Sequence, residues 1–216
     1  MNLLNLLFQQ PILFIVIVGA LLFTLSIHEF AHAYVGNVLG DPTAERMGRM
    51  TLNPLAHIDP LGFLMILLIG FGYAKPVPFN PVLLKYRTWG PAFVAAAGPI
   101  SNLILGTVCA VTYGILYPIL GPDTMLIVAL FFLGVINFAL MTFNLIPIPP
   151  LDGSKVLFAA LSHPRFRTFR ETLELRGSTI LLIFIFLDIF FRIGIFSWIF
   201  DISNFFFNFF TFRWIF

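Results

Sequence analysis

The chain has 216 residues, of which 59% are hydrophobic and 10% are charged, and its net charge is +2. Soluble domains are typically about 45–50% apolar and about 25% charged, so this composition excludes that class. Several apolar runs approach or exceed the ~20 residues that span a bilayer, and no basic run indicates nucleic-acid binding. We therefore expect an all-α integral membrane protein, with residues 1–216 forming one domain embedded in lipid.

Four apolar stretches are predicted to cross the membrane: residues 11–36, 92–117, 125–146 and 178–200. The first begins at Pro11, and proline is favoured at a helix start. Residues 61–72 are also apolar, but twelve residues make only ~18 Å of helix. This stretch is too short to cross, and we expect it to be a re-entrant or buried segment.

The segments outside the predicted spans have two further features. Prolines at 76, 78 and 81 favour extended or edge-strand backbone over helix, and 48–54 has the composition of a short strand. We therefore expect a small edge β element beside the helices, near the cytoplasmic face. The tail, residues 201–216, is rich in aromatics with polar residues at helical spacing, which is typical of a helix lying in the membrane interface.

Charge distribution predicts the orientation. Ten of the twelve Lys and Arg residues fall in the loops 37–60, 73–91 and 147–177. Basic residues concentrate on the cytoplasmic side of membrane proteins, so all three loops are expected there if 61–72 does not cross. The N-terminus is then outside. We expect a multi-pass protein of the cell (inner) membrane, and no oligomeric state is indicated.

The first predicted span ends in a polar pattern, His28-Glu29-x-x-His32. Residues four apart on a helix project from nearly the same face, so His28 and His32 can hold one metal ion between them. Glu29, beside the first histidine, is placed to act as general base on a water molecule that the metal activates. Ionisable residues within membrane helices are rare and usually functional. The pattern therefore predicts a metal site.

Two histidines leave a catalytic zinc site incomplete, because such sites usually have three protein ligands. Asp152 follows the third span at the depth of His32, and geometry favours it over His57 and Asp59, which remain alternatives. Three other acidic residues are less suitable as the third ligand. Asp188 has a ready partner in Arg192, Asp41 has the setting of a turn residue, and Asp123 is on the opposite side of the membrane.

Two motifs in this order resemble those of the site-2 protease family of intramembrane zinc metalloproteases. They are His28-Glu29-x-x-His32 and Asn144-x-x-Pro147-x-Pro149-x-Leu151-Asp152-Gly153, and Asn53-Pro54-x-x-His57-Ile-Asp59-Pro60 resembles a compact subgroup without a PDZ module. The resemblance implies that Asp152 is the third ligand of one zinc ion per chain. It also implies that Asn144 contacts the substrate or transition state and that Asn102, in a Gly98-Pro-x-x-Asn pattern, faces the substrate. His57 then becomes a residue that supports the ligands from behind.

The expected function is zinc-dependent intramembrane endopeptidase activity on transmembrane proteins or peptides near the cytoplasmic face. A substrate helix must unwind before cleavage, and the extended 73–81 segment can bind the unwound strand through backbone hydrogen bonds. The alternative is a membrane metal-binding protein or transporter that uses the same ligands without hydrolysis. That alternative requires polar groups through the membrane, and Thr24 is the one polar residue among residues 12–25.

Overall fold

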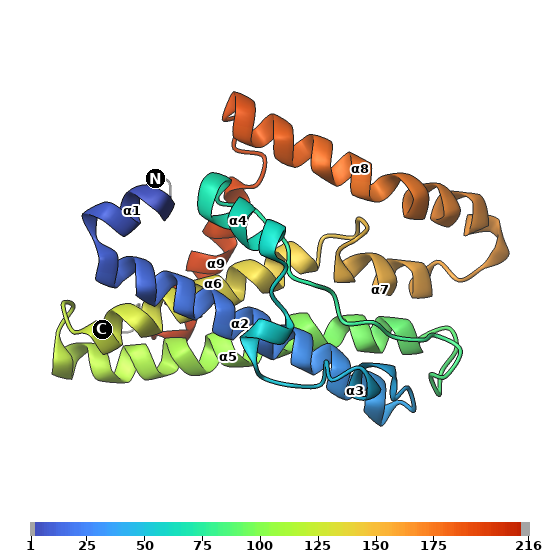
Figure 1. Cartoon of the computed structure of the whole chain (residues 1–216), viewed down its shortest axis with the longest axis horizontal. Coiled ribbons are helices and arrows are strands. Elements are labelled where there is room, and N and C mark those ends of the chain that lie inside the picture. The colour runs from blue at the N-terminus through green and yellow to red at the C-terminus, as the bar shows by residue number, and fades with distance from the viewer. Residues whose placement is uncertain (1–2, 213–216) are drawn as a thin grey trace.

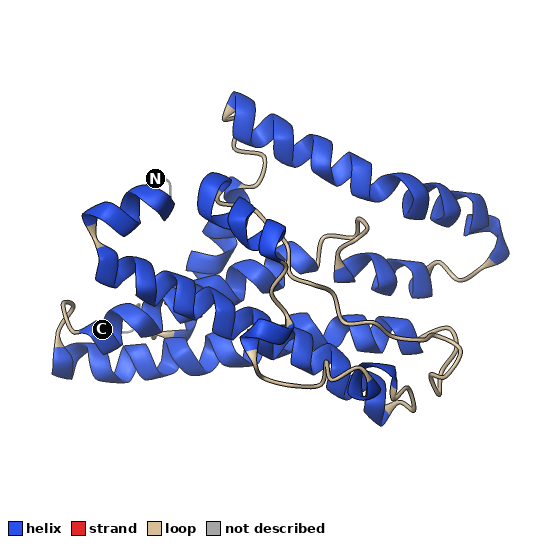
Figure 2. Cartoon of the chain, in the orientation of Figure 1, coloured by secondary structure: helices blue, strands red, loops and turns tan. Residues whose placement is uncertain are grey.

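The computed structural model describes residues 3–212, and this part of the chain is helical with no strand (Figures 1 and 2). The predicted all-α fold is therefore confirmed. The elements in chain order are α1 (Leu3–Gln9), α2 (Pro11–Val38), α3 (Thr43–Arg46), the 3-10 helix η1 (Pro54–Ala56), α4 (Pro60–Ile69), α5 (Gly90–Leu120), α6 (Met125–Asn144), α7 (Asp152–Ala160), the 3-10 helix η2 (Pro164–Phe166), α8 (Arg167–Phe191) and α9 (Ser197–Phe210).

Three helices, α2, α5 and α6, are long and apolar enough to cross a membrane. They lie side by side and pack against one another, and together they form the centre of the molecule (Figure 1). The first two predicted spans fall within α2 and α5, and the third, 125–146, extends two residues beyond the end of α6. The chain is therefore an integral membrane protein built around this three-helix bundle.

Helix α5 is the central element, because it also contacts α7 and α9. Its first turns carry buried small residues, among them Ala95, Ala97 and Gly98, which permit close approach of a neighbouring helix. Its second half contributes to a core of larger side chains, formed by Ala110, Tyr113, Ile127, Phe138, Met141 and Phe207. One half of α5 thus allows a tight approach to α2, whereas the other is filled by aromatic packing.

The predicted fourth span, residues 178–200, is wrong as a single helix. Helix α8 ends at Phe191, and Arg192 adopts a left-handed conformation with φ 52°. The predicted pairing of Asp188 with Arg192 is also absent, because the Asp188 carboxylate accepts hydrogen bonds from Ile195 N (2.5 Å) and Phe196 N (3.3 Å). Backbone N–H groups just before a helix lack intrahelical partners, and a carboxylate satisfies them. Three helices, not about four, thus qualify as spans in the described part.

Helix α9 is amphipathic, as the spacing in the tail predicts. Its apolar face packs on α5 and α6, where Phe207 contacts Tyr113 and Phe131 with ring centroids 5.1 and 5.2 Å apart. Asp201 and Asn204 are on the exposed face. Residues 213–216 of the predicted tail lie outside the described residues.

The re-entrant prediction for 61–72 agrees with the path of the chain. Helix α4 has only 10 residues, and the chain then doubles back, so that the backbone of Tyr73 lies directly against Gly62 with no room for a Cβ. Two residues further on, Lys75 N donates to His57 O at 2.8 Å. The loops before and after α4 therefore meet on the same side of the bundle, which is the arrangement expected of a re-entrant segment.

The predicted edge β element does not form. Residues 74–80 are extended, but no neighbouring strand pairs with them in the described part of the chain. The prolines have no N–H to offer a ladder, and three of the remaining amides are bonded elsewhere: Lys75 N to His57 O, Val77 N to Glu29 and Asn80 N to Asp41. The sequence pattern that predicts a strand therefore belongs to an extended segment, which single hydrogen bonds connect to the rest of the chain.

This hairpin path predicts which loops share a side of the membrane. In a Cys109→Ala background, single cysteines at Thr88 and Ser162 should respond alike to an impermeant thiol reagent in intact cells, and one at Asp123, between α5 and α6, should respond oppositely. Labelling is read by a mass shift after purification. A different response at Thr88 and Ser162 would mean that residues 60–72 cross the membrane.

Candidate metal centre

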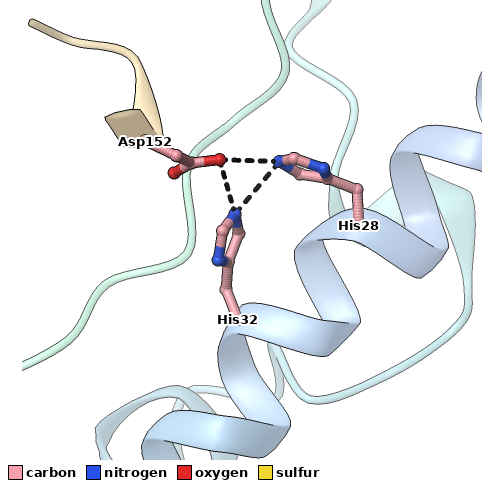
Figure 3. Close-up of side chains that lie close together, drawn as sticks. All are labelled: His28, His32 and Asp152. Atoms are coloured by element: carbon pink, nitrogen blue, oxygen red, sulfur yellow. Dashed lines mark hydrogen bonds and ion pairs between the residues drawn. The ribbon is translucent and has the colours of Figure 1, made fainter. Parts of the chain in front are cut away.

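The two histidines of α2 meet Asp152 of α7 at one point (Figure 3). The Nε2 atoms of His28 and His32 are 3.0 Å apart, and Asp152 Oδ2 lies 3.2 Å from the first and 3.3 Å from the second. Both histidines are at least nine-tenths buried. Among the described residues, this is the one group of three or more His, Cys, Asp or Glu side chains arranged to hold a metal ion.

Asp152 reaches this point because of the turn between α6 and α7. Leu151 is buried against α8, and its carbonyl accepts hydrogen bonds from both the backbone N and the hydroxyl of Ser154. The carbonyl oxygens of Leu145 and Ile146 occupy the space beside Gly153 where a Cβ would stand. The Leu-Asp-Gly-Ser sequence therefore fixes the start of α7, and the first residue of that helix is the aspartate.

The proton positions on the two imidazoles favour a metal ion at the meeting point. His32 Nδ1 lies 2.7 Å from Val94 O, and His28 Nδ1 lies 3.1 Å from Asn102 Oδ1. Both partners are acceptors, so each Nδ1 carries the proton and each neutral ring turns a bare Nε2 lone pair towards Asp152. Asp152 Oδ2 is itself buried without a hydrogen-bond donor. Three electron-rich atoms thus converge, and a metal cation satisfies all three at once, whereas an added proton satisfies only one pair.

The spacing fits a small tetrahedral ion. Ligand atoms ~2.0–2.1 Å from zinc at tetrahedral angles stand about 3.3–3.4 Å apart, and the three observed separations are 3.0, 3.2 and 3.3 Å. Burial raises the pKa of Asp152, but when the imidazoles carry a proton on Nε2 in place of a metal, their hydrogen bonds and positive charge lower it to about 2. A positive charge at this point therefore keeps the carboxyl group ionised at neutral pH, as a metal ligand must be.

One face of α5 supports the two histidines. Val94, Gly98 and Asn102 are spaced four residues apart and so lie on the same side of the helix. The first and third accept hydrogen bonds from the imidazoles, and a Cβ at Gly98 would lie 2.5–2.6 Å from atoms of both rings. Partners of this kind fix the tautomer and orientation of ligating histidines. Gly98 is therefore required for space and its two neighbours for orientation.

Glu29 lies on α2 beside His28 but bonds to a different part of the chain. Its Oε2 accepts a hydrogen bond from Val77 N at 3.1 Å, in the extended segment after α4. The other oxygen, Oε1, has no hydrogen-bond partner among residues 3–212. The carboxylate is thus held at one oxygen while the other is free to receive a proton.

Several predicted residues lie elsewhere. His57 bonds through Nε2 to Thr51 O at 2.8 Å, and Asp59 caps α4 by accepting from Gly62 N, so neither joins the cluster as a third ligand. His57 also has no hydrogen bond to His28, His32 or Asp152, and the residue that bonds to His28 on the far side of its ring is Asn102. Asn102 is fully buried and bonds to His28, and its contact with the substrate stays a prediction.

Asn144 is half-buried, and its amide donates to Leu140 O of its own helix at 3.0 Å.

Asn137 of α6 makes a contact that the sequence did not predict, because it reaches Asn102, the hydrogen-bond partner of His28. The Asn102 amide group approaches Asn137 O at 3.5 Å, and Asn137 Nδ2 donates to Thr24 Oγ1 of α2 at 2.9 Å. A lone asparagine in an apolar span was the available signal, since such residues often bond between membrane helices.

A His-Glu-x-x-His helix inside a membrane bundle, completed by an aspartate from another element, defines a membrane protein with a candidate metal centre of the metallopeptidase type. The model of peptidase family M50 matches residues 121–187, which include Asn144 and Asp152. A protein of Bacillus subtilis (strain 168) named "Putative zinc metalloprotease YwhC" is 39% identical over 150 residues, covering 65% of this chain and 67% of that protein. The chain therefore belongs to peptidase family M50, and the resemblance to the site-2 proteases is confirmed.

Two further relatives have the name "Putative zinc metalloprotease Rip2". One, from Mycolicibacterium smegmatis (strain ATCC 700084 / mc(2)155), is 33% identical over 150 residues, which are 65% of this chain and 55% of the relative. The other, from Mycobacterium tuberculosis (strain ATCC 25618 / H37Rv), is 28% identical over 199 residues, which are 88% of this chain and 75% of the relative. No solved structure matches the chain.

The space at Gly98 gives one test of the site. Gly98→Ala should reduce bound metal at least about 10-fold, because the new methyl group must displace one of the imidazoles. Gly19→Ala, on the same helix as the histidines, is the matched control, since a Cβ there meets nothing within 4 Å. Metal content of the purified proteins by mass spectrometry gives the result. Equal metal in the two variants would contradict the arrangement of α5 against α2.

The third ligand gives another test. Asp152→Ala should lose most of the bound metal, because two imidazoles alone hold it weakly. His57→Ala should keep it, since His57 bonds to Thr51 O and not to the cluster. His163→Ala, at an exposed residue before η2, is the control. Metal lost from His57→Ala and kept by Asp152→Ala would exclude Asp152 as a ligand.

Proposed function

We propose that this chain is a zinc-dependent intramembrane endopeptidase, with one zinc ion held by His28, His32 and Asp152. The observation that carries the proposal is that His28 Nε2, His32 Nε2 and Asp152 Oδ2 converge on one point beside α2, a helix long and apolar enough to span a membrane. Membership of peptidase family M50 supports it, as do the names of relatives that describe zinc metalloproteases.

Two imidazoles and one carboxylate suit zinc, and three protein ligands leave a position for substrate or water, as in catalytic zinc sites. When bound, zinc supplies Lewis-acid polarisation of the scissile carbonyl and lowers the pKa of water towards ~7. The residues of the chain do the rest. Val94 and Asn102 keep the imidazoles in the ligating tautomer, and the turn before α7 holds Asp152 in place.

Glu29 acts as the general base. Its free Oε1 takes the proton of the attacking water, and the same carboxyl later delivers it to the leaving amine. Asn144 serves as a transition-state contact: its amide exchanges the carbonyl of Leu140 for the developing oxyanion.

The substrates are transmembrane proteins or peptides that reach the site from the bilayer. A helix hides its peptide bonds in hydrogen bonds, so the substrate must unwind before hydrolysis. The site lies towards the end of α2 where the three basic loops gather, and these loops are cytoplasmic by the positive-inside rule. Cleavage near the cytoplasmic face of the cell membrane follows, with the N-terminus outside.

The alternative, a metal-binding protein or transporter without hydrolysis, has less support. A transport route needs polar groups that continue through the membrane. Residues 11–23 of α2 have no polar side chain, and Thr24 is fully buried with its hydroxyl bonded to Asn137. The core around Phe138, in the half of the bundle away from the basic loops, is built of apolar and aromatic side chains.

Glu29→Gln tests the proposal. The variant should keep zinc, because all three ligands remain, and should lose at least about 100-fold in cleavage of a synthetic single-span peptide in detergent. Glu45→Gln is the control, because Glu45 is exposed and bonds to Asn37 away from the cluster. Cleavage products are identified by mass spectrometry. Retention of more than a tenth of wild-type turnover would remove Glu29 from the mechanism.

A further inference from the structure

Residues 75–80 form an extended strap that is anchored to α2 and to the loop after it. The strap is too rich in proline for a sheet, so single hydrogen bonds hold it. Four such bonds connect it to the rest of the chain: Lys75 N to His57 O (2.8 Å), Arg49 Nη2 to Lys75 O (2.6 Å), Val77 N to Glu29 Oε2 (3.1 Å) and Asn80 N to Asp41 Oδ2 (2.5 Å).

The anchors on either side of Glu29 are charged and buried. Asp41 is 1% exposed and Arg49 is 8% exposed, and neither forms a salt bridge in the described part of the chain. Burying a charged side chain is unfavourable unless it is hydrogen-bonded. Hydrogen bonds to charged groups are stronger than neutral ones, so both charges fix the strap firmly on the two sides of Val77.

The middle bond reaches the general base. The backbone of α2 fixes the Cα of Glu29, but its side chain has three rotatable bonds and needs a further contact to set the carboxylate. Val77 N supplies that contact at Oε2 and leaves Oε1 open. Because the donor is a backbone amide, its position depends on the strap and its anchors rather than on the valine side chain.

We propose that the Val77 amide is the positioning group of Glu29, and that Asp41 and Arg49 hold the strap so that the carboxylate stays directed at the reacting water. This inference rests on the proposed function. Displacement of a catalytic group by about 1 Å can cost ~100-fold in rate, so the arrangement of the strap determines turnover although the strap contributes no ligand. Asp41 and Arg49 are positioning residues that act through the backbone of residues 75–80.

Val77→Pro removes the amide hydrogen that bonds to Glu29. Val77 already lies between Pro76 and Pro78, and its φ is not positive. The kcat for the synthetic single-span peptide should fall about 10- to 100-fold, with KM and zinc content within about twofold of wild type. Val77→Ala keeps the amide, and the ratio of kcat between the alanine and proline variants isolates it. A raised KM with unchanged kcat would mean that the strap binds substrate, and would overturn the proposal.

A second measurement does not depend on activity. If Val77 N bonds to Glu29, the shifts in melting temperature caused by Glu29→Ala and Val77→Pro should be non-additive in the double variant by at least about 2 °C. Additive shifts would overturn the contact. If the wild-type protein binds zinc but cleaves no peptide, the proposed function fails. The double-mutant cycle of melting temperatures still decides whether the strap holds Glu29.

Arg49 provides a variant outside the strap for the case in which Val77→Pro does not fold. Arg49→Gln weakens the anchor at Lys75 O and should lower kcat with KM and zinc content retained. Arg49→Lys keeps a charged donor for that carbonyl and should restore most of the kcat. An unchanged kcat in Arg49→Gln, or no recovery in Arg49→Lys, would exclude the strap as the positioning element.

Discussion

The site depends on one constraint: the lone pairs of three side-chain atoms must be held close together within a bundle of membrane helices. His28, His32 and Asp152 each present an unprotonated atom to the other two, at 3.0–3.3 Å. These atoms repel one another until a cation joins them, so the protein has to oppose that repulsion from outside the cluster. It does so with two buried hydrogen bonds on the far sides of the imidazoles and with the fixed turn that begins α7. Preorganisation of this kind is what a metal site requires of its surroundings.

The supporting contacts explain why α5 is the central helix. Its 94–102 face approaches α2 so closely that Gly98 has no room for a side chain, and that closeness brings Val94 O and Asn102 Oδ1 to the two Nδ1 atoms. Small residues at helix contacts are common in membranes because they increase van der Waals contact. Here the same feature has a chemical consequence. One face of α5 sets both the packing of two spans and the tautomers of His28 and His32.

The fold class and the central part of the site could be predicted from sequence, because both depend on side-chain identity. Apolar length indicates the spans, and His-Glu-x-x-His together with Asp152 indicates the metal. What could not be predicted depends on the backbone or on partner choice. Val94 acts through a carbonyl, which any residue provides, and Val77 through an amide N–H, which any residue except proline provides. Asn102 was expected to face the substrate. Its hydrogen bond to His28 could not be predicted, because that bond depends on how closely α5 approaches α2. Asp188 has a plausible charged partner in Arg192, yet unpaired amides at the break before α9 bind it instead.

The segment that was predicted to be a strand, residues 75–80, instead provides a hydrogen bond to Glu29, a charged residue within a membrane helix. Glu29 lies about 100° around α2 from His28, on the side that the strap covers, and an ionised carboxylate in hydrocarbon is costly. The α4 hairpin returns the chain so that a backbone amide is available at that place. Non-helical backbone near membrane depth is tolerated where few of its polar groups are left unpaired. Prolines at 76, 78 and 81 have no N–H to satisfy, and the amides of Lys75, Val77 and Asn80 are bonded. The proline-rich composition that suggested an edge strand is therefore what allows an unpaired, extended segment to lie beside Glu29.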